Sequence, residues 1–177
     1  MTEPLHPRLV TGSDWLEKIA RFRVMVWASH DMVDLSKFPD GICYEEVDRI
    51  AAHFIVESNG ELLGASRYAQ YPDLASSHHG EYYKNAGIDL EGPIGIPEHF
   101  VVHPDWERHG IGSKILKMQQ AHAIANNARF LISEASPAAA ALLIQLGRKS
   151  LGPAPHDPRF PGMQFQWMLT DLRSVQN

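Results

Sequence analysis

Two closely spaced glycines, Gly110 and Gly112, are the residues whose type and position point most directly to a chemical role. Because glycine has no Cβ atom, its backbone can approach a ligand closely. An apolar segment, residues 98–103, precedes the two glycines, and an amphipathic helix is predicted to begin with them. The first N–H groups of a helix have no partner within it and lie at the positive end of the helix dipole. The sequence therefore predicts an anion site here, most naturally for phosphate.

Two other glycine-rich phosphate loops do not match this segment. A Walker loop has Lys followed by Ser or Thr after its last glycine, whereas Ser113 and Lys114 follow Gly112 in the reverse order. A dinucleotide fingerprint has three glycines and an acidic residue about 20 positions further on. This turn has only two glycines, and little parallel α/β repeat precedes it.

The turn resembles motif A of the GCN5-related N-acetyltransferase (GNAT) superfamily, which reads R/Q-x-x-G-x-G/A after the fourth strand. Here the motif is Glu107 to Gly112, E-R-H-G-I-G, so Glu107 stands where Arg or Gln is usual. Arg108 is the candidate to supply the positive charge instead. The resemblance implies that acetyl-CoA or another acyl-CoA is the cosubstrate, with its pyrophosphate on the turn and its pantetheine arm along the preceding strand. The residues assigned to the cosubstrate are Phe100, Val101, Val102, His103, Arg108, His109, Gly110, Ile111, Gly112, Ser113 and Ser136.

The remaining patterns predict the elements that position this turn. They are a strand near residues 8–10, a helix over 13–27, an irregular stretch over 28–47, strands over 52–56 and 62–68, a long connection over 71–96, the strand 98–103, a helix over 110–126, a strand over 129–134, a helix over 136–147 and a strand over 163–169. This order is similar to the GNAT layout over nearly the whole chain. The resemblance implies an α/β (α+β) fold with a mixed sheet of six to seven strands, splayed between strands 4 and 5 and flanked by about four helices. We expect one domain over residues 1–177.

Glu98 is the candidate general base, because acyl transfer requires a deprotonated amine. It precedes Phe100 by two residues, and regular strand spacing would place both side chains on one face. Family members often carry a Glu on this strand. The alternative is a carboxylate at the strand edge that forms only a salt bridge. The family's usual acid for the leaving thiolate is a Tyr, and Leu143 stands at its position. Tyr82, Tyr83 or water is then a candidate acid, unless the thiolate leaves without one.

The chain has ten histidines, so a single His is weak evidence for a role in proton transfer. His99 and His103 border the predicted cleft, and His103 before Pro104 is expected to be a turn residue. The pair His78–His79 has no carboxylate or Cys at ligand spacing in the sequence. We therefore expect a solvated loop there and predict no metal site.

The N-terminal half offers candidate acceptor-binding residues, namely Trp27, Asp48 and Arg67. Arg67 lies in an otherwise apolar strand, where a buried charge needs a partner. Asp48 is the candidate partner; alternatively, the pair binds a charged end of the acceptor, such as a carboxylate at Arg67.

Within the superfamily, this half resembles the ElaA-like acetyltransferases and, more distantly, the acyl-homoserine-lactone synthases. The synthases share an Arg, a Trp, an Asp, an Arg and a Glu in the order found here at Arg23, Trp27, Asp48, Arg67 and Glu98. The Ser-Arg-Phe that follows the Glu in synthases is absent. His99 and Phe100 stand there instead.

Composition excludes several other classes of protein. The apolar fraction of 44% and charged fraction of 21% are those of an ordinary globular protein, and a net charge of −5 argues against sequence-independent nucleic-acid binding. There is no apolar run for a membrane span and no signal-peptide pattern. Cys43 is the only cysteine, so neither an internal disulfide nor a Cys-based zinc site is expected. We expect a cytoplasmic protein; homodimers are common in the fold.

These observations predict an N-acyltransferase, most naturally an N-acetyltransferase, that moves an acyl group from acyl-CoA directly to the amine of a small molecule. The irregular stretch 28–47 and the connection 71–96 are expected to shape the acceptor pocket. Cys43 lies in the first of these and is not expected to act as a nucleophile. One alternative is an acyltransferase similar to the homoserine-lactone synthases. The other is an acyl-CoA-binding module without catalysis.

Overall fold

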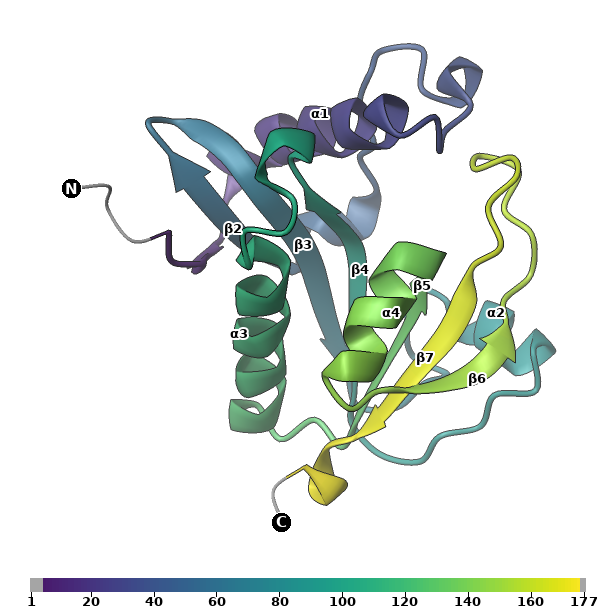
Figure 1. Ribbon diagram of the computed structural model, residues 1–177. Helices are drawn as coiled ribbons and strands as arrows, with labels where there is room; N and C mark the ends of the chain where they lie inside the picture. The colour runs from purple at the N-terminus through teal and green to yellow at the C-terminus, as the bar shows by residue number, and fades with distance from the viewer. Residues whose placement is uncertain (1–4, 176–177) are drawn as a thin grey trace. The chain divides into compact units, whose positions relative to one another are not determined.

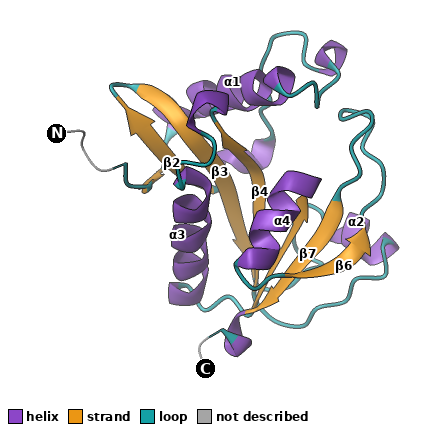
Figure 2. Cartoon of the chain, in the orientation of Figure 1, coloured by secondary structure: helices purple, strands orange, loops and turns teal. Residues whose placement is uncertain are grey.

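The computed structural model describes residues 5–175 (Figure 1). The α-helices are α1 Ser13–Ser29, α2 Gly80–Asn85, α3 Ile111–Ala125 and α4 Pro137–Gln145. The strands are β1 Arg8–Val10, β2 Ala52–Ser58, β3 Glu61–Tyr71, β4 Ile94–Val102, β5 Phe130–Ala135, β6 Lys149–Pro153 and β7 Gln166–Asp171. The short 3-10 helices are η1 Leu35–Lys37, η2 Glu46–Arg49, η3 Pro104–Trp106 and η4 Leu172–Ser174. The strands form a seven-stranded mixed sheet in the order β1-β2-β3-β4-β5-β7-β6, which confirms the predicted fold class. Figure 2 shows the strands in orange and the helices in purple.

The chain divides into two compact units, each assembled from segments that are separate in sequence. The first unit comprises the chain up to Tyr68, His99–Gln119 and Asp157–Gly162. In this unit β1 pairs antiparallel with β2, and β2 pairs antiparallel with β3. The β2–β3 turn contains Asn59 and Gly60, with φ of 51° and 80°. Positive φ at both central residues is the geometry that Asn-Gly favours in two-residue hairpins, so this turn follows directly from the sequence.

The second unit comprises Ala69–Glu98, Gln120–His156 and the chain from Met163 onward. In it β7 pairs antiparallel with both β5 and β6, and Figure 1 shows α4 across the front of β5 and β7. The core of this unit joins side chains of α2, β4, β5, β7 and two loops, namely Leu74, Tyr83, Ile94, Ile96, Phe130, Ile132, Ala154 and Trp167. No helix within residues 5–175 has both the length and the apolar character needed to cross a membrane.

Helix α4 begins and ends where the sequence predicts. The Oγ of Ser136 accepts a hydrogen bond from the N–H of Ala139 at 3.3 Å, and Pro137 occupies the first helical position. At the other end Gly147 adopts φ of 85°, and the N–H of Arg148 donates to the carbonyl of Leu143 at 3.0 Å. This is the Schellman arrangement, in which a left-handed glycine ends the helix.

Three elements differ from the prediction. β4 begins at Ile94 rather than at residue 98, because Gly95 and Pro97 disfavour strands and conceal the alternation of the fully buried Ile94 and Ile96. Helix α2 lies within the predicted connection 71–96, and its six residues are too few to show a helical period. Strand β6 has mostly exposed side chains, so it lacks a hydrophobic pattern.

The splay predicted between the fourth and fifth strands is confirmed by their pairing. β4 and β5 form a parallel ladder at Ile94–Phe130 and Gly95–Leu131, the first two residues of each strand. Both strands continue beyond this short ladder, β4 to Val102 and β5 to Ala135. β4 also contains an irregularity, since His99 has φ of 49°. A left-handed residue inside a strand interrupts the alternation of side chains. The assumption of regular spacing between Glu98 and Phe100 was therefore wrong.

Candidate functional site

The glycine turn before α3 presents a row of main-chain N–H groups. Arg108 and Gly110 have φ of 61° and 78°, and α3 begins at Ile111. The first N–H in this segment with a main-chain acceptor is that of Lys114, which donates to the carbonyl of Gly110 at 3.1 Å. Across residues 5–175, no carbonyl or side chain accepts a hydrogen bond from the N–H groups of residues 108–113. Consecutive N–H groups in alternating left- and right-handed conformations form an anion-binding concavity.

At the start of the turn, Glu107 stands where the motif usually has Arg or Gln, and Arg108 follows it. The carboxylate of Glu107 lies 2.7 Å from Nε2 of His30, so its negative charge has a local partner. Arg108 is exposed, and no carboxylate of the described chain pairs with its guanidinium. Arg108 therefore offers a positive charge to an anion at this turn.

Helix α3 is held against β3 by a close approach at Gly64. A Cβ atom at Gly64 would lie 2.8 Å from Cγ2 of Ile111 and 2.8 Å from Cδ1 of Ile115. Both isoleucines are buried, so the absence of a side chain at Gly64 sets the position of the first turn of α3. In the strand before the turn, Val101 is buried and Phe100 and Val102 are half-buried.

His103 is a turn residue, as expected. Its N–H donates to the carbonyl of Leu63 at 2.9 Å, and its Nδ1 accepts from the N–H of Asp105 at 3.2 Å. The ring thereby caps η3, and it also stacks with Phe22 at a centroid separation of 6.4 Å.

A buried ionic network occupies the first unit. Asp48 accepts hydrogen bonds from both terminal nitrogens of Arg23, at 2.8 and 3.1 Å, and lies 3.2 Å from Nη1 of Arg67. The three side chains have exposed fractions of 2%, 1% and 0%. The predicted partnership of Asp48 with Arg67 is confirmed, and Arg23 joins it. Burial alone would raise the pKa of Asp48, but the Arg23 and Arg67 charges and the hydrogen bonds hold it below its usual value.

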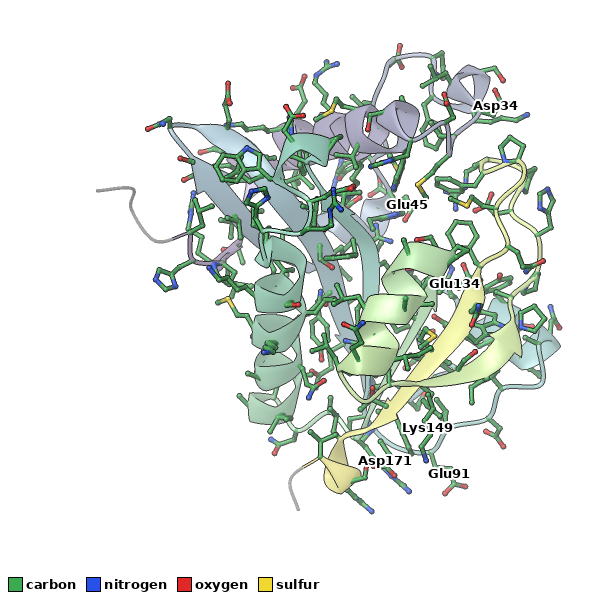
Figure 3. All side chains as sticks on the ribbon, viewed as in Figure 1. Asp34, Glu45, Glu91, Glu134, Lys149 and Asp171 are labelled. Carbon is green, nitrogen blue, oxygen red and sulfur yellow. The ribbon has the colours of Figure 1, made fainter. Side chains whose placement is uncertain are left out.

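Glu45, whose side chain is labelled in Figure 3, pairs with Arg67 and is the half-buried member of this network. Its carboxylate accepts a hydrogen bond from Nη2 of Arg67 at 2.7 Å, and lies 3.3 Å from Nη1 of Arg159 and 3.3 Å from Nε2 of His99. Burial opposes ionisation of Glu45, but the hydrogen bonds and charges of His99 and Arg67 outweigh it, so the pKa lies well below the ordinary value. Glu45 is 30% exposed and Arg159 is 39% exposed, which makes them the accessible part of the network.

Trp27 lies beside this network in an aromatic cluster. Its ring centroid is 5.5 Å from that of His99, 5.0 Å from that of Phe160 and 6.1 Å from that of Phe38. Trp27 is buried, so it supports the surrounding rings more than it offers a surface of its own.

Glu98 lies in the second unit with two histidines. Its carboxylate oxygens are each 2.9 Å from a ring nitrogen, Oε2 from Nε2 of His78 and Oε1 from Nε2 of His79. The prediction that His78 and His79 form a merely solvated loop was wrong, since a carboxylate distant in sequence reaches both rings.

Two tyrosines considered as thiolate acids also lie in the second unit. Tyr83 is buried, and burial together with the Glu98 charge raises its pKa well above the usual value. The hydroxyl of Tyr82 donates to the carboxylate of Glu134. Leu143, at the family's Tyr position, is packed in the core.

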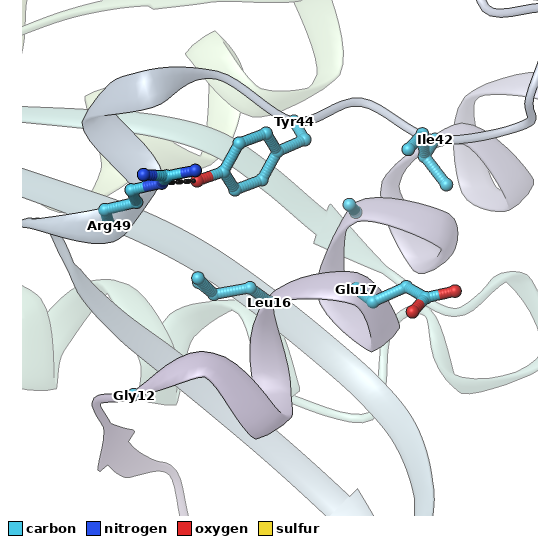
Figure 4. Close-up of a pocket in the computed structure, with 7 residues that line it drawn as sticks. Gly12, Leu16, Glu17, Ile42, Tyr44 and Arg49 are labelled. Carbon is cyan, nitrogen blue, oxygen red and sulfur yellow. Dashed lines mark hydrogen bonds between the residues drawn. The ribbon is translucent and has the colours of Figure 1, made fainter.

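A separate hollow of about 570 Å³ lies in the first unit (Figure 4). It is lined by Gly12, Leu16, Glu17, Ala20, Ile42, Tyr44 and Arg49. Arg49 donates to the hydroxyl of Tyr44 at 2.8 Å, and none of the predicted site residues lines this hollow.

Comparison with known families agrees with the turn and the fold. The profile of the acetyltransferase (GNAT) domain matches residues 49–147, which include the hairpin, β4, the glycine turn and α4. The chain belongs to the GNAT family. A search of curated proteins finds no significant sequence match.

Solved structures share the GNAT fold at low sequence identity. The CoA-dependent acyl-homoserine lactone synthase BjaI has a TM-score of 0.72 and 13% identity, covering 97% of this chain and 85% of that one. FeeM, an N-acyl amino acid synthase from uncultured soil microbes, has a TM-score of 0.66 and 12% identity, with coverage of 94% and 90%. A putative GNAT acetyltransferase from Desulfovibrio desulfuricans has a TM-score of 0.64 and 12% identity, with coverage of 95% and 99%.

In this GNAT protein, sequence reasoning missed Glu45 and Arg159 as members of the network. They are separated by 114 positions, and both lie in irregular segments without a hydrophobic period. One sequence signal was present, because Glu45 precedes Asp48 by three residues. The N–H of Glu45 donates to Asp48 at 2.8 Å, a capping-box arrangement around η2.

Proposed function

We propose that this GNAT protein is a cytoplasmic N-acyltransferase that moves an acyl group, most naturally acetyl, from acyl-CoA to the amine of a small molecule. The observation that carries the proposal is the row of N–H groups at residues 108–113, for which residues 5–175 provide no hydrogen-bond acceptor. These groups and Arg108 would bind the pyrophosphate, and the preceding segment Phe100–His103 would bind the pantetheine arm. Ser136, which caps α4, is a further candidate contact for CoA.

Titration calorimetry with CoA tests this cosubstrate site. We expect binding by the natural protein and an affinity loss on the order of tenfold in Gly110→Val, because a β-branched residue at φ of 78° costs about 1–2 kcal/mol. Gly60→Val is the matched control, since Gly60 has φ of 80° and equally open space around it but lies in the β2–β3 hairpin. Absence of CoA binding, or equal losses in the two variants, would contradict the proposal.

The proposed reaction is a direct transfer. The amine nitrogen attacks the thioester carbonyl, the N–C bond forms and the C–S bond breaks, while Glu98 accepts the amine proton directly or through water. The thiolate then takes a proton from water or a tyrosine. An acyl-enzyme on Cys43 is disfavoured, because burial raises the pKa of its thiol to about 11. Turnover in Cys43→Ala supports direct transfer.

A screen of amines with acetyl-CoA, following release of free thiol, tests catalysis. We expect Glu98→Gln to lower kcat by about 10²- to 10⁴-fold while CoA affinity persists, as for loss of a general base. Binding of CoA without turnover over a wide amine panel would instead support a non-catalytic acyl-CoA-binding module.

We propose a modified role for Trp27, Asp48 and Arg67, the residues predicted to bind the acceptor. Asp48 and Arg67 are too deeply buried for direct contact, so we propose that they and Trp27 position the accessible pair Glu45 and Arg159. An acceptor with an ammonium and a carboxylate group would be complementary to this pair. The test compares KM for amino acids with KM for simple amines. Arg159→Met should bring these two KM values closer together.

A second candidate is a reaction similar to that of BjaI, and one observation favours it. Arg23, Trp27, Asp48, Arg67 and Glu98 match the synthases in type and order, and four of them lie in or beside the buried network. Because BjaI is a CoA-dependent synthase, a CoA-binding turn does not argue against this candidate. Incubation with S-adenosylmethionine and an acyl-CoA would give an acyl-homoserine lactone, methylthioadenosine and free CoA; absence of the lactone would exclude this candidate.

A further inference from the structure

The cluster of Glu98 with His78 and His79 contains a set of metal ligands. Two imidazole nitrogens and one carboxylate oxygen, one atom from each residue, lie within 4.8 Å of one another. In a tetrahedral site with bonds of about 2.1 Å, ligand atoms are about 3.4 Å apart. The two nitrogen–oxygen distances of 2.9 Å are therefore a few tenths of an ångström shorter than an ion requires. Small side-chain rotations would open the site.

The loop that carries the two histidines is held in place before any ion binds. The N–H of Ser77 donates to the carbonyl of Leu74 at 3.1 Å, and the N–H of Gly80 donates to the carbonyl of Ser77 at 3.0 Å. Gly80 approaches the loop so closely that a Cβ atom there would lie 2.3 Å from the carbonyl oxygen of Ala75. Leu74 is buried in the core of the second unit. A rigid loop lowers the entropy that the ligands lose on binding.

The third ligand is held on the same core. Glu98 follows Ile94 and Ile96 along β4, and both isoleucines belong to the core cluster that contains Leu74. The Glu98 side chain is 15% exposed, whereas that of His79 is 37% exposed, so an ion has access from the solvent side at His79.

The hydroxyl of Tyr71 can form a hydrogen bond with His78 both without and with a metal ion. This hydroxyl lies 2.7 Å from Nδ1 of His78. Without metal, the hydroxyl donates to Nδ1, and the protonated Nε2 of His78 donates to Glu98. With metal, Nε2 is the ligand, and the proton on Nδ1 is donated to the hydroxyl oxygen, which can also accept. An outer partner of this kind orients a metal-ligating histidine.

We propose that His78, His79 and Glu98 form a binding site for one divalent transition-metal ion, with Tyr71 as the outer partner of His78. Two imidazoles and one carboxylate favour Zn²⁺, Co²⁺ or Fe²⁺ over Mg²⁺ and Ca²⁺, which prefer sites made entirely of oxygen ligands. Three protein ligands leave at least one coordination position for water or another ligand. The proposal goes beyond the acyl transfer, and the two roles of Glu98 exclude each other, because a carboxylate bound to the ion cannot also accept the amine proton.

The test is titration of the chelator-treated full chain with Co²⁺, followed by visible absorption, and with Zn²⁺, followed by calorimetry. We expect one ion per chain with Co²⁺ or Zn²⁺ and no heat with Mg²⁺. Loss of an outer partner typically costs 10–100-fold in metal affinity, so Tyr71→Phe should weaken Co²⁺ binding by about that factor. His78→Ala and His79→Ala should each weaken it by more.

His156→Ala is the matched control, because His156 is exposed in the loop between β6 and β7, outside the cluster. Circular dichroism establishes that each variant is folded. Glu98→Gln is a third ligand variant that nearly preserves side-chain volume, and it should also weaken Co²⁺ binding. Lack of Co²⁺ binding by the natural protein would overturn the proposal. Equal affinity in folded His78→Ala and His79→Ala, or an equal loss in His156→Ala, would overturn it as well.

Discussion

Asp48 and Arg23 form an ion pair of 2.8 Å between side chains that are only 2% and 1% exposed. Asp48 also lies 3.2 Å from Nη1 of Arg67, which pairs with Glu45 as well, so the Asp48 carboxylate contacts two buried guanidinium groups. We predict that Asp48→Asn lowers the free energy of unfolding by about 3–5 kcal/mol, since removing one partner leaves buried charge without compensation. Urea unfolding measures this difference. Glu17→Gln, which breaks an exposed pair with Arg21, is the control and should change stability by less than about 1 kcal/mol.

The buried ring of His53 should make the free energy of unfolding depend on pH. The ring is buried, and its Nε2 donates to the carbonyl of Asp48 at 2.9 Å. Burial lowers the pKa of His53 and outweighs the opposing effect of this hydrogen bond. As pH falls below the ordinary pKa of about 6.5, the unfolded chain gains a proton that the folded chain resists. Stability should therefore decrease between pH 7.5 and 5.5.

The measurement for this prediction is the free energy of unfolding in urea at several pH values. His53→Gln should give a shallower slope over the same range, because the variant has no ring to protonate. The exposed His156 provides a comparison, and His156→Gln should keep the natural slope. A natural protein whose stability rises on acidification through this range would refute the prediction.

Gly64 contacts the first turn of α3 so closely that a side chain at this position should affect both stability and cosubstrate binding. Gly64→Ala should lower the free energy of unfolding by about 1–3 kcal/mol, because its Cβ would overlap Ile111 and Ile115. It should also weaken CoA binding, since Ile111 begins the helix whose N–H groups form the proposed site. Ile115→Val removes the Cδ1 atom in the overlap, so it should recover part of the loss when combined with Gly64→Ala. Additive losses in the double variant would argue against this packing explanation.

Replacement of the buried Arg148 by an apolar residue should stabilise the protein. Arg148 is 3% exposed, and none of its guanidinium nitrogens has a hydrogen-bond partner in the described part of the protein. Burial lowers the pKa of this guanidinium to about 10. Arg148→Met should raise the free energy of unfolding by about 1–3 kcal/mol, because it removes buried donors that lack acceptors. Thermal unfolding tests this, with the exposed Arg173→Met as a neutral control. A lower melting temperature in Arg148→Met would show that the guanidinium is compensated.

The sequence by itself determined the features that depend on neighbouring residues. The Asn59-Gly60 hairpin, the glycine turn at residue 110 and the start of α4 at Ser136 each follow from the allowed φ and the hydrogen-bonding groups of a few consecutive residues. The same local signals failed for β4 before residue 98, where Gly95 and Pro97 concealed a strand that tertiary burial stabilises.

Apart from the pairing of Asp48 with Arg67, only the tertiary structure decided which charged side chains meet. Glu45 joins Arg159 across 114 positions, and Glu98 reaches His78 across 20. No periodicity records such a pairing, because it depends on how the sheet and loops bring distant segments together. The conformation of His99, with φ of 49°, is likewise maintained by its surroundings, since a non-glycine residue is rarely left-handed on its own account. Local backbone preferences thus account for the turn, whereas long-range packing accounts for the ionic network and the histidine cluster.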